Sequence, residues 1–188
     1  MRAGVGMLSG MTLGVLGVGS IGGHAAKVGQ GFDMRVIGLR RTGQAHPHVE
    51  QMYAPDERME FFAQADVIMN SLPLTEKTRG FVGWDEFAAM KRGAIILNTG
   101  RGPTINTEAL MAALREGRLG GALLDVTDPE PLPEDHPLWS MENVHLTPHY
   151  SGNHPGYDER AGAIFLDNLQ RYLEGRPLRN VVDKQEGY

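Results

Sequence analysis

Residues 12–43 read TLGVLGVGSIGGHAAKVGQGFDMRVIGLRRTG, and this stretch decides the fold class. It opens with a short apolar run at 12–17, continues through a glycine-rich turn into a helix-like segment, and ends in a second apolar run at 34–39. Continuous short apolar runs are typical of parallel strands that are buried on both faces of a sheet. The stretch therefore predicts a strand, a crossover helix and a second, parallel strand.

The same alternation continues through the rest of the chain. Further strands are predicted at 66–70, 94–98, 121–126 and 144–147. Helices are predicted at 20–31, 56–64, 84–91 and 106–117, and a last helix at 158–174, which Gly175 ends. Strands that alternate with helices predict an α/β fold, a Rossmann-type doubly wound parallel sheet flanked by helices.

The composition bounds the classes of function. The chain has 188 residues, 41% of them hydrophobic and 22% charged, which is ordinary for one globular domain with a little to spare. The net charge of −5 argues against a general binder of nucleic acid or of anionic membranes. The absence of cysteine excludes disulfides, thiolate metal sites and a cysteine nucleophile. His46 and His48 have no further ligand at a suitable spacing, so no metal site is predicted.

Residues 1–19 faintly resemble a signal peptide, with a basic start and an apolar run of small residues. The same residues serve better as the approach to the first strand, and no convincing cleavage site precedes that strand. No run reaches the ~18 apolar residues that a membrane span needs. The cytoplasm is therefore the expected compartment.

Gly17, Gly19 and Gly22 form a G-x-G-x-x-G pattern between the first strand and the first helix. In this position the first glycine permits a tight turn, the second lets the backbone approach a pyrophosphate, and the third allows the helix to pack closely on the strand. The N-terminus of the helix then faces the phosphates. Glycine-rich turns also occur for structural reasons, but the place of this one between a strand and a helix favours dinucleotide binding.

Arg40, Arg41 and Thr42 follow the second strand, at the position where an acid would hold the ribose 2′-hydroxyl of NAD. Two guanidinium groups and a hydroxyl suit a 2′-phosphate instead, because arginine binds phosphate through paired, charge-assisted hydrogen bonds. The alternative is a solvated basic turn. The local chemistry favours NADP(H) over NAD(H).

Arg101 and Asp125 lie at the ends of the two strands predicted at 94–98 and 121–126. Ligands of such sheets bind beyond the carboxyl ends of the strands. Arg101 would hold a carboxylate near the nicotinamide, and Asp125 would accept a hydrogen bond from the nicotinamide amide. The structural alternatives are a surface arginine in a glycine turn and an aspartate that caps a helix or a turn.

Glu130 and His149 lie in two proline-containing segments, DPEPLP and LTPHYSG. Because proline restricts the backbone, these loops would help to aim a side chain. A glutamate beside a histidine is a recognisable acid–base pair, in which the carboxylate orients the imidazole and favours its protonated form. Taken singly, each residue is more simply explained as part of a turn.

Together these segments resemble a known family. TLGVLGVGSIG, LPLT, NTGRG, GALLDVTDPEPLP, HPLW and TPHYSG occur in the order and spacing of the D-isomer-specific 2-hydroxyacid dehydrogenases. The resemblance runs from Leu8 to the C-terminus and so covers nearly the whole chain. The segments LRRT and NVVDKQEGY look most like the glyoxylate/hydroxypyruvate reductase branch.

The resemblance implies roles for the candidate residues. Arg101 would bind the substrate carboxylate and keto oxygen, His149 would act as the general acid–base, and Glu130 would be its carboxylate partner. Ser20 and Ile21 would lie at the pyrophosphate. The other positions implied to contact or border the cofactor are Leu72, Pro73, Thr99, Gly100, Arg101, Asp125, His149, Tyr150, Ser151 and Gly152. The implied reaction is hydride transfer between NAD(P)H and a small 2-keto acid, in a homodimeric enzyme.

The chain departs from the family in two ways. Arg40 stands where most members carry an acid, which puts NAD preference in doubt. The resemblance also implies an N-terminal segment that forms most of the family's substrate domain, and we expect the few residues before the first strand to be too short to supply it. Residues 1–157 are therefore expected to form the NAD(P)-binding domain, and residues 158–188 a helix and tail that would normally return to the substrate domain.

Two functions stay open on this basis. The first is a 2-keto acid reductase whose other segment is missing or supplied in trans. The second is a truncated cofactor-binding module that binds NADP(H) and dimerises with little or no catalysis. An unrelated Rossmann oxidoreductase would not explain the later motifs.

Overall fold

A computed structural model describes residues 6–184 and 186–188. The chain divides into two compact units, one that ends at His149 and one that runs from Tyr150 to Tyr188. All buried apolar side chains of the described residues belong to the first unit, which therefore contains the core. The expected domain boundary between residues 157 and 158 stays a prediction.

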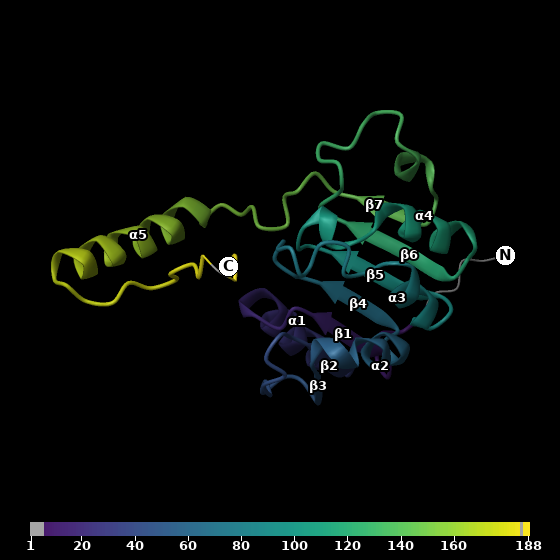
Figure 1. Cartoon of the computed structure of the whole chain (residues 1–188), viewed down its shortest axis with the longest axis horizontal. Coiled ribbons are helices and arrows are strands. Elements are labelled where there is room, and N and C mark those ends of the chain that lie inside the picture. The colour runs from purple at the N-terminus through teal and green to yellow at the C-terminus, as the bar shows by residue number, and fades with distance from the viewer. Residues whose placement is uncertain (1–5, 185) are drawn as a thin grey trace. The chain divides into compact units, whose positions relative to one another are not determined.

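The first unit is built on one sheet whose strands all run parallel (Figure 1). In the part of the chain that the structure describes, this sheet has seven strands in the order β3-β2-β1-β4-β5-β6-β7. The strands are β1 (Thr12–Leu16), β2 (Arg35–Leu39), β3 (Gln51–Tyr53), β4 (Val67–Asn70), β5 (Ala94–Asn98), β6 (Leu119–Leu124) and β7 (Val144–Leu146). The order reverses direction between β1 and β4, which is typical of a doubly wound sheet, so the predicted fold class is confirmed.

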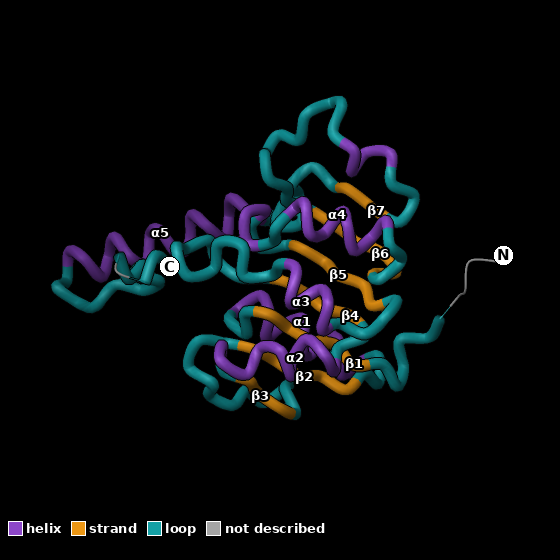
Figure 2. The backbone as a smooth tube through the Cα atoms, turned by 45° about the vertical axis from the view of Figure 1, so that its right-hand side comes forward, coloured by secondary structure: helices purple, strands orange, loops and turns teal. Residues whose placement is uncertain are grey.

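Helices lie on both faces of this sheet (Figure 2). The helices of the unit are α1 (Ser20–Gly31), α2 (Arg58–Gln64), α3 (Trp84–Ala89) and α4 (Thr107–Arg115), with 3-10 turns η1 (Pro55–Glu57), η2 (Gly102–Thr104) and η3 (Pro137–Ser140). Through Ala26, α1 packs on the face that presents Leu13 and Val15. On the opposite face, α2, α3 and α4 form a larger apolar cluster with Ile68 and Ile96.

The ends of α4 follow from local sequence. The Asn106 side chain accepts a hydrogen bond from the backbone N–H of Ala109 at 2.9 Å, as an N-cap residue does. Gly117 adopts a φ of +63° just past the helix, in the left-handed region that favours glycine. Helix α4 lies within the range 106–117 that was predicted for it, and α1 spans the residues predicted for it.

Other boundaries differ from the prediction. The sequence pattern misses β3, because its three residues contain no apolar run. The helix predicted at 84–91 ends at Ala89, because Arg118 donates hydrogen bonds to the carbonyls of Phe87 at 3.0 Å and Met90 at 2.8 Å. A side chain from the loop before β6 thus satisfies carbonyl groups that would otherwise lack partners at the end of the helix.

Two predicted elements are shifted along the chain. The helix predicted at 56–64 begins as η1 and becomes α-helical only at Arg58. The strand predicted at 121–126 begins earlier, at Leu119, and ends at Leu124. Asp125 therefore follows its strand directly, at the edge of the sheet where a ligand would lie.

The second unit consists of α5 (Tyr157–Leu173) and a tail. The helix matches its predicted range within one residue at each end, and Gly175 follows with a φ of +66°. The Asn168 side chain accepts a hydrogen bond from the Arg179 N–H at 2.8 Å and donates to the Arg179 carbonyl at 3.0 Å, which fastens the tail to the helix. No described residue of α5 is buried. Among the helices that the structure describes, none is long and apolar enough to cross a membrane.

Candidate active site

The candidate residues of the first unit gather at one edge of the sheet. Each lies just beyond the carboxyl end of a strand, and parallel strands end at the same edge. From the middle of the sheet outward they are the glycine-rich turn after β1, residues 40–42 after β2, Leu72 and Pro73 after β4, residues 99–101 after β5, Asp125 after β6 and His149 after β7. Tyr150, Ser151 and Gly152 belong to the second unit, so their predicted roles stay predictions.

The three glycines of the glycine-rich turn have different structural roles. Gly17 has a φ of +91° and donates its N–H to the carbonyl of Leu39 at 2.9 Å. A Cβ atom at Gly22 would lie 2.3 Å from the carbonyl oxygen of Gly17, so the helix packs against the turn only without a side chain. A Cβ atom at Gly19 would meet no protein atom within 4 Å. Gly19 therefore presents bare backbone to open space, which fits the approach of a pyrophosphate.

The N-terminus of α1 adds a favourable electrostatic field to this turn. Gly19 is the N-cap residue and supplies no side-chain hydrogen bond, and the first turn of α1 contains no acidic residue. The first N–H groups of the helix and the positive end of its dipole therefore stay available to an anion. Ser20 and Ile21 lie exposed in this first turn, where the resemblance places contacts to the pyrophosphate.

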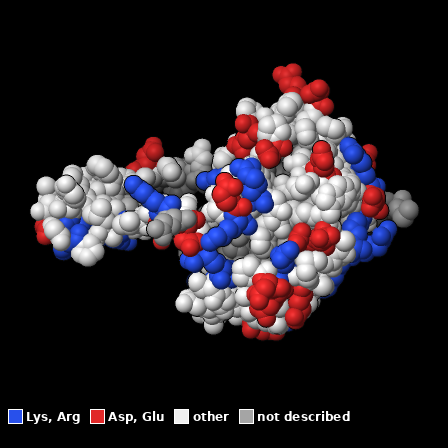
Figure 3. Space-filling view, viewed as in Figure 1, with Lys and Arg blue, Asp and Glu red and all other residues white. Residues whose placement is uncertain are grey.

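Arg40 lies against the glycine-rich turn. Its guanidinium donates to the carbonyls of Ala45 at 3.1 Å and Val18 at 3.5 Å, while its Nε is buried and has no hydrogen-bond partner. Buried N–H groups are nearly always bonded, so this one fits an acceptor such as a ligand phosphate. Arg41 and Thr42 are exposed beside it. Figure 3 shows basic side chains gathered along the edge of the first unit at which the strands of Figure 1 end.

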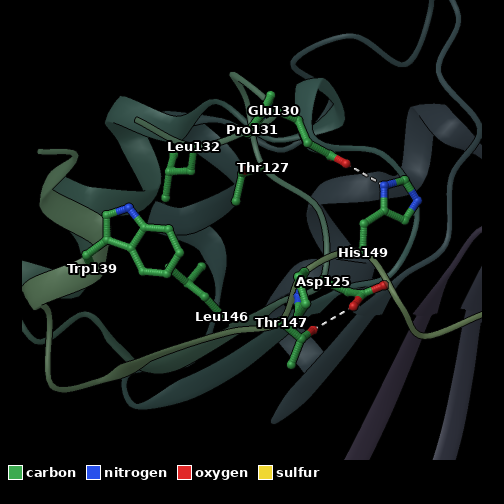
Figure 4. Close-up of a pocket in the computed structure, with 10 residues that line it drawn as sticks. Asp125, Thr127, Glu130, Pro131, Leu132, Trp139, Leu146, Thr147 and His149 are labelled. Atoms are coloured by element: carbon green, nitrogen blue, oxygen red, sulfur yellow. Dashed lines mark hydrogen bonds and ion pairs between the residues drawn. The ribbon is translucent and has the colours of Figure 1, made fainter. Parts of the chain in front are cut away.

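Asp125 is buried, and its hydrogen-bond partner is Thr147, which directly follows the neighbouring strand β7. Its Oδ1 accepts a hydrogen bond from the Thr147 hydroxyl at 2.6 Å (Figure 4). The side chain thus joins the ends of β6 and β7 rather than capping a helix. Its role at the nicotinamide amide stays a prediction.

Glu130 and His149 form the pair that the sequence predicts. The Glu130 carboxylate accepts a hydrogen bond from Nδ1 of His149 (Figure 4). The loop that carries Glu130 is held by a hydrogen bond from the Trp139 indole to the Pro133 carbonyl at 2.8 Å. His149 itself follows Pro148 with a φ of +51°, a conformation that non-glycine residues adopt at a cost of order 1 kcal/mol. Such strain is concentrated at functional sites.

The pairing assigns the two ring nitrogens of His149. Because a carboxylate can only accept, Nδ1 must carry the hydrogen, and Nε2 is left to donate or accept a proton. In Figure 4 the second ring nitrogen points away from Trp139 and Leu146. A cavity of about 400 Å³ lies beside the pair, and it is lined by Asp125, Thr127, Glu130, Pro131, Leu132, Trp139, Leu146, Thr147, Pro148 and His149.

Arg101 occupies a different part of the same edge. It is exposed and precedes η2, and its Nη1 donates to the Gly100 carbonyl at 2.7 Å. It does not line the cavity beside His149. Its role in substrate binding stays a prediction.

Three polar side chains that were not predicted as part of the site are buried beneath this edge, namely Asn70, Asn98 and Thr104. Asparagine at the last position of two neighbouring strands, β4 and β5, was the available signal. No group of three or more histidine, aspartate or glutamate side chains that would hold a metal occurs among the described residues.

The fold and this edge define a Rossmann-type dinucleotide-binding domain that carries a hydrogen-bonded glutamate–histidine pair. The family model for the NAD-binding domain of the D-isomer-specific 2-hydroxyacid dehydrogenases matches residues 2–151. The chain belongs to this family.

Relatives of known name and structure agree with that assignment. A glyoxylate reductase of Aeropyrum pernix is 37% identical over 180 residues, which are 95% of this chain and 53% of the relative. A 2-hydroxyacid dehydrogenase of Xanthobacter autotrophicus Py2, solved with NADPH, matches with a TM-score of 0.89 and 36% identity over 95% of this chain and 73% of that one. An NADPH-dependent glyoxylate/hydroxypyruvate reductase of Sinorhizobium meliloti, solved with NADP, matches with a TM-score of 0.89 and 32% identity over 95% and 57%. The chain spans about half the length of the curated relatives it matches.

Proposed function

We propose that this chain is the cofactor-binding and acid–base part of a reductase that converts a small 2-keto acid, such as glyoxylate or hydroxypyruvate, into a D-2-hydroxy acid. The observation that carries the proposal is the hydrogen bond between Glu130 and His149 at the same sheet edge as the glycine-rich turn. A cofactor site without an acid–base group would bind a dinucleotide but would have no means of protonating a reduced carbonyl.

Some residues at this edge would bind the cofactor, and others would bind the substrate. Gly19 and the first turn of α1 would hold the pyrophosphate, and Asp125 would accept a hydrogen bond from the nicotinamide amide. When bound, NAD(P)H supplies the hydride. Arg101 would hold the substrate carboxylate, because its paired N–H groups match the geometry of a carboxylate.

His149 would move the proton. Its Nε2 would donate to the alkoxide oxygen that forms as the keto carbon is reduced, and in the reverse direction it would take the proton from the hydroxyl. Glu130 would hold the ring in the required orientation and stabilise the imidazolium that exists before donation. The strained φ of His149 supports this assignment, since the fold holds the residue in a conformation it would not choose alone.

We propose NADP(H) as the preferred cofactor. The proposal is supported by the buried, unpartnered Nε of Arg40 next to the glycine-rich turn and by the absence of an acid in residues 40–42. The two similar solved proteins named above contain NADPH or NADP. A carboxylate at this place would repel a 2′-phosphate, whereas a guanidinium attracts it.

A second candidate function is a cofactor-binding module with little or no catalysis of its own. The observation that favours it is that the chain spans about half the length of its curated relatives. A homodimer and a cytoplasmic location belong to both candidates as proposals, and the family resemblance supports them.

The test is reduction of 2-keto acids by the purified chain, followed through loss of reduced-nicotinamide absorbance. NADPH and NADH are each combined with glyoxylate, hydroxypyruvate and pyruvate, and cofactor binding is titrated in parallel. Turnover that a His149→Ala variant loses while it still binds NADPH supports the reductase. Cofactor binding without turnover on any substrate favours the binding module, and no binding of either cofactor contradicts both candidates.

A further inference from the structure

Three polar side chains are buried together beneath the loops that follow β4 and β5. Asn70 is 0% exposed, Asn98 is 1% exposed and Thr104 is 0% exposed. The Asn70 side-chain amide donates to Oδ1 of Asn98 at 3.1 Å and to the Thr104 hydroxyl at 2.7 Å. We call these three residues the Asn–Thr cluster.

The hydrogen bonds of the Asn–Thr cluster run in one consistent direction. Asn70 uses both of its amide hydrogens within the cluster, so its Oδ1 is left to accept, and it accepts from the backbone N–H of Leu72 at 3.1 Å. The Thr104 hydroxyl accepts from Asn70 and donates its single hydrogen to the carbonyl of Arg101 at 2.6 Å. Each donor of these two side chains therefore has a partner.

The outward bonds of the cluster reach only the two loops. Asn98 accepts from the N–H of Gly100 at 3.1 Å and donates to the Arg101 carbonyl at 3.2 Å. The Arg101 carbonyl thus accepts two side-chain hydrogen bonds from the cluster, in addition to one from the backbone N–H of Thr104 at 3.2 Å, while the Arg101 side chain is exposed. Apolar side chains at the three positions would fill the core without the desolvation cost of polar groups. We therefore attribute the polar side chains of the cluster to the hydrogen bonds that they make to the two loops.

The two loops also touch directly. A Cβ atom at Gly100 would lie 2.7 Å from the carbonyl oxygen of Leu72, so the backbones pack together only because residue 100 is a glycine. Leu72 lies on the adenosine side of the predicted cofactor site, and Arg101 lies on the substrate side. The Asn–Thr cluster therefore spans the distance between the two halves of the proposed site.

We infer that Asn70 and Thr104 are positioning residues, which fix the backbone of Arg101 relative to the Leu72 loop and so set where the Arg101 guanidinium meets a substrate carboxylate. The part of the inference that concerns substrate binding by Arg101 rests on the proposed function. The coupling of the two loops through one buried cluster does not depend on whether the chain turns over a substrate.

Thr104→Val is the variant that tests it, because valine keeps the shape of threonine and removes the hydroxyl. Hydrogen–deuterium exchange is measured in the ligand-free chain at the backbone amides of residues 71–72 and of residues 99–104, in which Pro103 has no amide hydrogen. We expect faster exchange in both loops, since the Arg101 carbonyl loses one donor and the Asn70 amide loses one acceptor. Faster exchange confined to 99–104 would overturn the coupling of the loops.

The second readout is kinetic. With saturating NADPH, Thr104→Val should raise the KM for glyoxylate on the order of tenfold while kcat changes less, because a misplaced Arg101 weakens capture of the carboxylate. Thr104→Ser restores the hydroxyl and should restore both the KM and the slow exchange. An unchanged KM in Thr104→Val, with faster exchange in both loops, would overturn the link to Arg101.

Arg118→Met provides the control for a general loss of stability. Arg118 holds the end of α3, because its side chain donates to the carbonyls of Phe87, Ala88 and Met90 and to neither loop. This variant should be destabilised and yet keep the wild-type KM and the slow exchange of both loops. If the wild-type chain shows no turnover, the proposed function fails, and the exchange experiment still decides whether the cluster couples the loops.

Discussion

The carboxylate of Glu130 accepts a hydrogen bond from Nδ1 of His149, although the two residues are 19 positions apart in the chain. Glu130 lies in the loop after β6, and His149 follows β7, the neighbouring strand at the edge of the sheet. Parallel pairing of these two strands places both loops at one end of the sheet, so the topology brings Glu130 and His149 together. The bond also leaves Nε2 as the imidazole nitrogen that is available to exchange a proton.

Removing this bond should lower the rate without abolishing cofactor binding. Glu130→Gln keeps the size of the side chain but removes its charge, and we expect kcat for glyoxylate reduction to fall by roughly 10²-fold, within the range of general acid–base effects. The kcat of His149→Ala should fall at least as far as that of Glu130→Gln. His145→Ala is the matched control, because His145 is an exposed histidine on β7 and should keep the wild-type kcat. Equal losses in all three variants would contradict the assigned pair.

Two glycines of the same turn should respond differently to alanine. At Gly22 a Cβ atom would lie 2.3 Å from the Gly17 carbonyl, so Gly22→Ala should lower the melting temperature. At Gly19 a Cβ atom meets no protein atom within 4 Å, so Gly19→Ala should keep the wild-type melting temperature and lose NADPH affinity. Thermal unfolding and cofactor titration of both variants separate the two effects. Wild-type NADPH affinity in Gly19→Ala would show that the pyrophosphate does not approach this backbone.

The arginines after β2 should determine the choice between cofactors. Replacing Arg40 and Arg41 together by alanine should weaken NADPH binding by ~1.5–3 kcal/mol for each charge-assisted hydrogen bond lost. The affinity for NADH should barely change, because NADH has no 2′-phosphate. Arg92→Ala, at an exposed position before β5, is the control and should leave both affinities unchanged. Equal losses of NADPH and NADH affinity in the double variant would contradict a specific contact to the phosphate.

Tyr53 should make the fold sensitive to alkaline pH. Burial raises the pKa of its phenol above the ordinary value, the Glu60 charge raises it further, and a hydrogen bond from Gln64 partly offsets both. Because the pKa is higher in the folded than in the unfolded chain, the stabilisation is fully present below the unfolded pKa of about 10 and is lost as the pH rises through the folded pKa.

Tyr53→Phe should remove this part of the pH dependence. The free energy of unfolding, measured by urea denaturation between about pH 9 and pH 11, should fall less steeply for Tyr53→Phe than for the wild type. Tyr172→Phe is the matched control, because Tyr172 is exposed and should follow the wild-type curve. Parallel curves for Tyr53→Phe and the wild type would show that Tyr53 does not cause the alkaline loss.

Much of the fold is predictable from local sequence. The strands β1, β2, β4 and β5 appear as apolar runs, and the glycine spacing after β1 follows from steric needs that involve only nearby residues. The caps of α4 are equally local, because Asn106 and Gly117 act on the helix they flank. By contrast, β3 has too few residues for a pattern, and α3 is shortened by Arg118 from a distant part of the chain.

By itself, the sequence determined the α/β alternation, the turn built for a phosphate and the residue types of an acid–base pair, because spacing and chemical character are properties of the chain. Only the tertiary structure decided which atoms meet. It assigned Nδ1 of His149 to Glu130, left Nε of Arg40 buried without a partner, and joined Asn70 to Thr104 beneath Arg101. These relationships depend on the register and order of parallel strands, which bring together residues that no local pattern connects.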